Sequence, residues 1–160
     1  MSKRYIYFLG WIAIVILLSF SFYLQFFDGI MPCPLCMLQR IAFALLGILF
    51  FLGIFLYAKR IYCFILNTLL LLTSSLGMLF AGRQIWLQHV PSNTNECGVT
   101  LQYMMQALPI TEVMQKIFEG SAECTQRGWE LASLNMAEWA LVWFIFFFLM
   151  SLYLLFKKVW

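Results

Sequence analysis

The fold is decided by an uncharged stretch of 23 residues, YIYFLGWIAIVILLSFSFYLQFF, which runs from Tyr5 to Phe27. Three further uncharged stretches, of 18, 22 and 18 residues, follow it along the chain. The hydrocarbon core of a bilayer takes about 20 helical residues, with a range of roughly 17 to 25. Only a helix satisfies its own backbone hydrogen bonds in lipid without closing a barrel. The sequence therefore predicts an all-α protein with four transmembrane helices at about 5–27, 41–58, 61–82 and 139–156.

The composition agrees with a membrane protein. Of the 160 residues, 64% are hydrophobic and only 11% are charged, and the mean hydropathy is +0.89. An ordinary soluble domain carries about 25% charged residues and could not keep so much apolar surface out of water. The net charge of +3 is too small and too scattered for a phosphate-binding surface. These values exclude a soluble globular protein, a disordered chain and a nucleic-acid partner.

The basic residues predict the orientation. Three short segments flank or connect the helices and contain no acidic residue, and their six basic residues are Lys3, Arg4, Lys59, Arg60, Lys157 and Lys158. The other two loops, 28–40 and 83–138, hold four basic and all seven acidic residues. Because basic residues in short segments stay cytoplasmic, we expect both termini inside and the two loops outside. The simplest organisation is one membrane domain over residues 1–160, an antiparallel four-helix bundle.

The N-terminal stretch has a second interpretation. Lys3 and Arg4 could form the basic region of a signal peptide, and Ser19-Phe20-Ser21 is a poor cleavage site. A length of 23 uncharged residues suits a spanning helix better.

The expected topology sorts the five cysteines. Cys63 lies at the cytoplasmic mouth of the third helix, where thiols stay reduced, and we expect a buried or membrane-facing structural thiol. The outer loops hold the other four, Cys33, Cys36, Cys97 and Cys124. In a bacterium this side is the oxidising periplasm, so these four are the candidates for disulfide chemistry.

Cys33-Pro34-Leu35-Cys36 lies at the outer entrance of the second helix. A C-x-x-C pair can form a readily exchanged disulfide, and a helix N-terminus lowers the pKa of a nearby thiol. Two other interpretations stay open, an inert disulfide and half of a zinc site. The zinc site would need Cys97 and Cys124, which lack the usual ligand spacing, so we expect no metal.

Arg40 follows Cys36 by four residues and therefore shares its helix face, one turn deeper. Its permanent charge could stabilise a Cys36 thiolate or the reduced oxygen of a carbonyl-type acceptor. The alternative role is an interfacial anchor whose head group reaches water.

The second outer loop contains an amphipathic pattern between Pro109 and Gly120. Its apolar positions recur at helical spacing, and they are Ile110, Val113, Met114, Ile117 and Phe118. We expect a short helix on the membrane surface, with packing on the bundle as the alternative.

The order of these motifs resembles the DsbB family, the bacterial quinone-linked disulfide oxidoreductases. The resemblance spans essentially the whole chain. It rests on the C-x-L-C-x-x-x-R element from Cys33 to Arg40, on Gly82-x-Gln84 through His89, and on two motifs before the fourth helix. Those two are Cys124-x-x-x-x-Trp129 and Leu134-x-Met136-x-x-Trp139, and Ala137 stands where the family usually has proline.

The resemblance implies a circuit for electrons in the bacterial inner membrane. The donor is a periplasmic thiol oxidase of the DsbA type, and the acceptor is a quinone of the membrane pool, ubiquinone or menaquinone. Carried over, Cys97 is attacked by DsbA, and Cys124 passes electrons to Cys33. Cys36 forms the thiolate that meets the quinone, with Arg40 beside it and His89 as a further quinone-site or rim residue.

The energetics agree with this direction. DsbA is a strong oxidant at about −120 mV, so its reoxidation needs an acceptor of higher potential, such as a membrane quinone. Two other functions remain. One is a reductive carrier of the vitamin K epoxide reductase type, and the other is a structural membrane protein with static disulfides.

Overall fold

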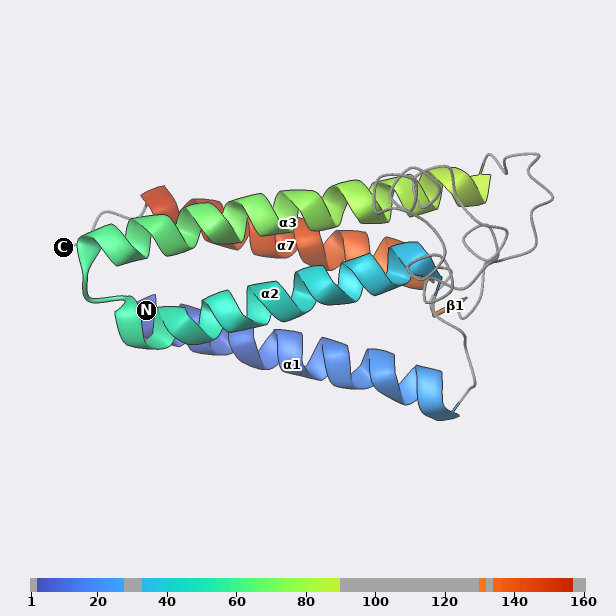
Figure 1. The fold of residues 1–160 in the computed structure, drawn as a ribbon, viewed down its shortest axis with the longest axis horizontal. Coiled ribbons are helices and arrows are strands. Elements are labelled where there is room, and N and C mark those ends of the chain that lie inside the picture. Colours follow the sequence, from blue (N-terminus) through green and yellow to red (C-terminus); the bar gives the residue numbers. More distant parts are fainter. Residues whose placement is uncertain (1–2, 28–32, 90–129, 132–133, 157–160) are drawn as a thin grey trace, which may run out of the picture.

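The computed structural model describes residues 3–27, 33–89, 130–131 and 134–156. Its long helices are α1 (Lys3–Phe27), α2 (Pro34–Leu56), α3 (Arg60–His89) and α7 (Met136–Phe156). They run antiparallel to one another in a bundle (Figure 1). All four are long and apolar enough to cross a membrane. The predicted four-helix membrane bundle is therefore confirmed, while the expected surface helix at 110–118 lies outside the described residues.

The bundle has two distinct ends. Lys3, the α2–α3 turn and Phe156 lie at one end, which we call the Lys59 end (Figure 1). Phe27, Cys33, His89 and Met136 lie at the other, which we call the Cys33 end. In sequence order each helix packs on the next, α1 on α2, α2 on α3 and α3 on α7.

All four long helices begin or end beyond the uncharged stretches that predict them. Helix α2 begins at Pro34 rather than near residue 41, and α3 continues to His89 rather than ending near residue 82. Charged and amide side chains at these positions are compatible with a helix because their polar groups find hydrogen-bond partners. The distance between charges is therefore a guide to the apolar part of each helix and not to its ends.

The start of α7 is set by a capping box. The side chain of Asn135 accepts a hydrogen bond from Glu138 N at 3.0 Å, and the Glu138 carboxylate accepts one from Asn135 N at 2.8 Å. This reciprocal pair satisfies backbone donors that a first helical turn leaves unpaired. It starts the helix at Met136 without a proline at position 137. Asn135 belongs to a short antiparallel ladder, in which β1 (Glu130–Leu131) pairs with β2 (Leu134–Asn135).

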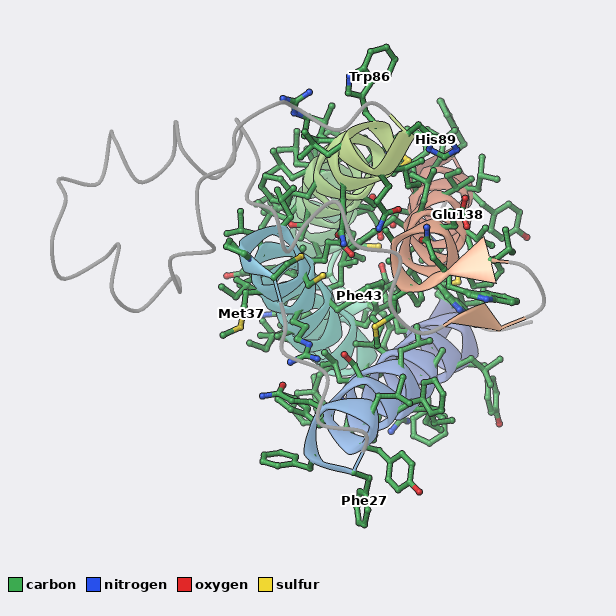
Figure 2. All side chains as sticks on the ribbon, turned by 90° about the vertical axis from the view of Figure 1, so that its right-hand side faces the viewer. Phe27, Met37, Phe43, Trp86, His89 and Glu138 are labelled. Carbon is green, nitrogen blue, oxygen red and sulfur yellow. The ribbon has the colours of Figure 1, made fainter. Side chains whose placement is uncertain are left out.

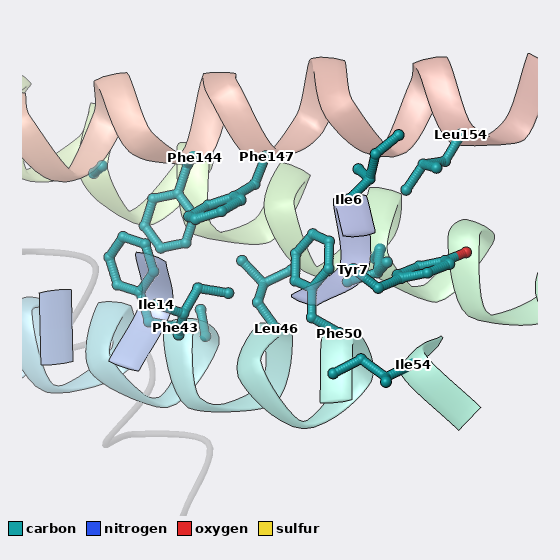
Figure 3. Close-up of a cluster of buried hydrophobic side chains, with 13 residues drawn as sticks. Ile6, Tyr7, Ile14, Phe43, Leu46, Phe50, Ile54, Phe144, Phe147 and Leu154 are labelled. Carbon is teal, nitrogen blue, oxygen red and sulfur yellow. The ribbon is translucent and has the colours of Figure 1, made fainter. Parts of the chain in front are cut away.

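Aromatic rings form the core between the helices. Phe43 of α2 stacks on Phe144 of α7 with ring centroids 4.1 Å apart, and Phe147 packs beside them (Figure 3). A Cβ atom on Gly77 would lie 2.2 Å from the Phe144 ring, so only glycine lets α3 approach α7 this closely. Small residues at helix contacts are typical of membrane bundles, where packing rather than water drives association.

The outer surface is apolar. Large hydrophobic side chains on all four long helices are exposed, among them Phe26, Phe55, Ile61, Leu79 and Phe156. Such a surface is stable against lipid hydrocarbon and would aggregate in water.

Candidate functional site

The C-x-x-C pair forms the first turn of α2. Cys33 is the N-cap residue, and its Sγ accepts a hydrogen bond from Cys36 N at 3.3 Å. Pro34 occupies the first helical position, where its missing N–H is no loss. The two sulfur atoms lie 2.7 Å apart. The local helix geometry therefore holds two thiols in position to be oxidised to a disulfide.

The two thiols differ in accessibility. Cys33 is buried, whereas Cys36 is partly exposed. Met37, the next residue, points away from the bundle at the same end (Figure 2). A small molecule in the surrounding membrane therefore reaches Cys36 more readily than Cys33.

Two buried glutamines lie against this pair, and sequence reasoning gave neither a role. Gln84 of α3 donates from Nε2 to Cys36 Sγ at 3.1 Å and to Cys33 Sγ at 3.5 Å. Gln39 of α2 donates from Nε2 to Gln84 Oε1 at 2.7 Å. One signal could have found them. An amide inside a membrane bundle needs a partner, and Gln39 lies one turn from Cys36.

Arg40 lies one turn deeper than Cys36 on α2, as its spacing predicts. Its Nε donates to Ser21 Oγ at 2.9 Å, one terminal nitrogen donates to Ser21 O at 3.1 Å, and the other donates to Gln25 Oε1. The guanidinium also lies over the Phe22 ring, 5.2 Å from its centroid. Arg40 therefore links α1 to the redox end of α2, a contact that sequence reasoning did not predict.

His89 lies at the same end on another face. It is the last residue of α3, its ring is exposed, and Nδ1 lies 2.9 Å from Ile85 O of the preceding turn. At 3.6 residues per turn it lies about 140° around α3 from Gln84. Figure 2 places it on the α7 side of α3. The prediction that His89 belongs to the same site as the C-x-x-C pair stays a prediction.

Cys97 and Cys124 lie outside the described residues. The start of α7, which follows Cys124 in the chain, contacts α3. Asn135 Nδ2 donates to Gln88 Oε1 of α3 at 2.6 Å, so the start of α7 is fixed to the last turns of α3.

Cys63 is buried at the Lys59 end, as expected for a structural thiol. Asn67 Nδ2 donates to Cys63 Sγ at 3.5 Å, and the Tyr7 hydroxyl donates to Asn67 Oδ1 at 2.8 Å. The Tyr7 oxygen lies 3.6 Å from Cys63 Sγ, which closes a ring of three side chains. At 1.5 Å per residue along α3, Cys63 is about 30 Å from Gln84. This thiol is therefore separate from the C-x-x-C pair.

A membrane bundle that holds two adjacent thiols against hydrogen-bond donors at one end defines a class, the membrane thiol–disulfide oxidoreductases. The family described as Disulfide bond formation protein DsbB matches residues 3–154. A protein of Hahella chejuensis, named Disulfide bond formation protein B, is 39% identical over 148 residues, which cover 92% of this chain and 90% of the relative. A protein of the same name from Azoarcus sp. is 38% identical over 89% of this chain and 86% of the relative. Disulfide bond formation protein B 1 of Pseudomonas aeruginosa is 38% identical over 90% and 89%.

The chain belongs to the DsbB family. It is a multi-pass bacterial membrane protein and an enzyme, a protein-disulfide oxidoreductase. The resemblance stated from the sequence is thereby confirmed.

Proposed function

We propose that this enzyme reoxidises a DsbA-type thiol oxidase in the periplasm and passes the two electrons to a membrane quinone. The observation that carries the proposal is the adjacent pair of cysteine sulfurs at the Cys33 end, with Gln84 donating to Cys36 and Arg40 one turn deeper on α2. The family match supports the direction of flow, since its members are named for disulfide bond formation.

The first exchange takes place in the second outer loop. A thiolate of DsbA attacks Cys97 of a Cys97–Cys124 disulfide, the S–S bond breaks, and Cys124 leaves with the electron pair. The second thiol of DsbA then attacks the mixed disulfide and releases Cys97. DsbA leaves oxidised, and the loop is left with two thiols, so electrons balance.

The second exchange moves the electrons to the C-x-x-C pair. The Cys124 thiolate attacks Cys33 of a Cys33–Cys36 disulfide, and Cys36 leaves as the thiolate. Attack by Cys97 on Cys124 restores the loop disulfide and releases Cys33. The donors around Cys36 favour this order because they stabilise the charge that develops on its sulfur.

The residues around Cys36 fit a quinone. When bound, a quinone supplies the acceptor chemistry, since it takes up two electrons and two protons. The partly exposed Cys36 would face it, and Arg40 would bind a carbonyl oxygen. Arginine has five N–H donors, and α1 uses three of them among the described residues, so donors remain for an acceptor oxygen. His89 is a further candidate, and ubiquinone and menaquinone both present the ring carbonyls that Arg40 would bind.

The proposed orientation places the Cys33 end in the periplasm and both termini in the cytoplasm. The basic residues Lys3, Lys59 and Arg60 support it, because the antiparallel helices bring all three to the Lys59 end (Figure 1).

The test follows the absorbance of a short-chain ubiquinone after reduced DsbA is added to the purified enzyme. We expect the quinone absorbance to fall, DsbA to become oxidised, and Cys36→Ser to abolish both changes. Cys63→Ser is the matched control and should retain turnover. A structural protein with static disulfides would give no change, and a reductive carrier would instead reduce oxidised DsbA with quinol. Either result would refute the proposal.

A further inference from the structure

The side-chain amide of Gln84 reaches the thiol pair from a neighbouring helix. Its Nε2 lies 3.1 Å from Cys36 Sγ and 3.5 Å from Cys33 Sγ, and the side chain is only 4% exposed. A neutral amide brings N–H donors to the sulfurs without the desolvation cost of a second buried cation. The Gln84 side chain therefore places a hydrogen-bond donor from α3 against the Cys36 sulfur.

Gln39 determines which way this amide points. An amide has a donor nitrogen at one side and an acceptor oxygen at the other. Gln39 Nε2 donates to Gln84 Oε1 at 2.7 Å, so the Gln84 oxygen faces Gln39 and its nitrogen faces the sulfurs. Gln39 is itself 5% exposed, so water does not compete for this bond. The two residues form a chain that ends on Cys36.

We infer that Gln39 and Gln84 are positioning residues of the redox reaction, which hold an N–H donor on Cys36 when its sulfur becomes a thiolate. This inference rests on the proposed function, in which Cys33–Cys36 is the disulfide that is attacked. When Cys124 attacks Cys33, the new bond joins Cys124 to Cys33, the Cys33–Cys36 bond breaks, and the electron pair moves to Cys36 Sγ. Gln84 donates to that sulfur, and a stabilised thiolate leaves faster.

Other groups at this end also carry charge or titrate. Those among the described residues are Tyr23 on α1, Arg40 on α2, Arg83 and His89 on α3, and Glu138 on α7. Of these, Arg40 lies closest to Cys36 along α2, one turn deeper. The glutamine variants leave all five of these residues unchanged in the sequence. A change in the titration of Cys36 in such a variant therefore reports the amide.

The experiment measures how fast Cys36 is alkylated as a function of pH in the full-length, reduced protein. Brief pulses of iodoacetamide are followed by mass spectrometry, which separates Cys36 from the other cysteines. The variants are Gln84→Met, Gln39→Met and the double variant, and methionine keeps the length without a donor. Gln88→Met is the matched control, because Gln88 lies one turn later on α3 and its described partner is Asn135.

We expect Gln84→Met to slow Cys36 alkylation at pH 7 by about tenfold, because the thiolate loses a hydrogen-bond donor. The rate at high pH should be unchanged, since the thiol is then ionised in both proteins. Gln39→Met should give a smaller shift in the same direction. The double variant should match Gln84→Met alone, because Gln39 acts through Gln84. Gln88→Met should match the parent protein.

An unchanged pH profile in folded Gln84→Met would overturn the inference. If Gln84→Met does not fold, the test rests on Gln39→Met. A pH profile of Cys36 alkylation in that variant that matches the parent protein would also overturn the inference. Additive shifts in the double variant would show that Gln39 does not act through Gln84. The alkylation needs neither DsbA nor quinone, so the failure of the proposed electron transfer would be seen separately in the quinone assay.

Discussion

Arg40 is bound to Ser21 through two nitrogens, with Nε 2.9 Å from the Ser21 hydroxyl and a terminal nitrogen 3.1 Å from its backbone oxygen. This contact joins α1 to α2 one turn below Cys36. The guanidinium that we propose to bind the electron acceptor therefore also holds α1 and α2 together. Its removal should affect both the reaction and the stability of the bundle.

We predict that Arg40→Ala lowers kcat/KM for quinone by at least about tenfold, equivalent to about 1.4 kcal/mol. Arg40→Lys keeps the charge but presents a single ammonium group, which cannot bind Ser21 and Gln25 in the same fork. It should fall between Arg40→Ala and the parent. Steady-state turnover at varied quinone measures this.

Ser21→Ala is the control for the helix contact, since it leaves the charge in place and removes only the hydroxyl acceptor. It should lower the melting temperature in detergent with a smaller effect on quinone kinetics. Normal turnover of Arg40→Ala at low quinone would instead make Arg40 a link between helices and nothing more.

The orientation predicts that the α2–α3 turn faces the cytoplasm. Ala58 is exposed in this turn, so Ala58→Cys offers a thiol to solvent, whereas Cys63 is 4% exposed and packs against Tyr7. A membrane-impermeant maleimide should label Ala58→Cys only after the cells are permeabilised. After reduction, Cys97 and Cys124 should react in intact cells. Labelling of Ala58→Cys in intact cells would show that the predicted orientation is wrong.

The proposed order of exchange predicts a trapped complex. Cys124→Ser removes the thiol that could reverse the attack on Cys97, so a mixed disulfide between Cys97 and DsbA should accumulate. The yield should be highest with a DsbA that lacks its resolving cysteine. Mass spectrometry locates the bond, and Cys97→Ser should give no such complex. A bond to Cys33 or Cys36 would show that DsbA reacts with the first loop directly.

The ring of Tyr7, Asn67 and Cys63 predicts a loss of stability without a loss of chemistry. Tyr7→Phe leaves the buried Asn67 oxygen without its donor, which should cost about 1–3 kcal/mol of folding free energy. Thermal unfolding in detergent should show a lower melting temperature, and kcat should be unchanged because the site is about 30 Å away. Tyr5→Phe, at an exposed position, is the matched control. A large loss of kcat in Tyr7→Phe would connect this end to the reaction.

The transmembrane architecture can be predicted from the amino-acid sequence, because the signals for it are local. A stretch such as Tyr5–Phe27 needs only its length and its lack of charge to predict a spanning helix. The C-x-x-C spacing likewise brings Cys33 and Cys36 together within one helical turn. The spacing from Cys36 to Arg40 predicts a shared helix face in the same way. The roles proposed for Cys97 and Cys124 rest on the family resemblance.

The surroundings of the thiols depend on how the helices pack, which local sequence patterns do not specify. Gln84 is 48 residues from Cys36 in sequence, and Gln39 is 45 residues from Gln84, so their contacts depend on how α3 packs against α2. The same holds for Arg40, whose partners Ser21 and Gln25 lie on α1, 19 and 15 residues earlier. Helical periodicity gives the face on which a side chain lies, but not which helix covers that face. Polar groups within an apolar bundle must pair, and the packing of the helices chooses the pairs.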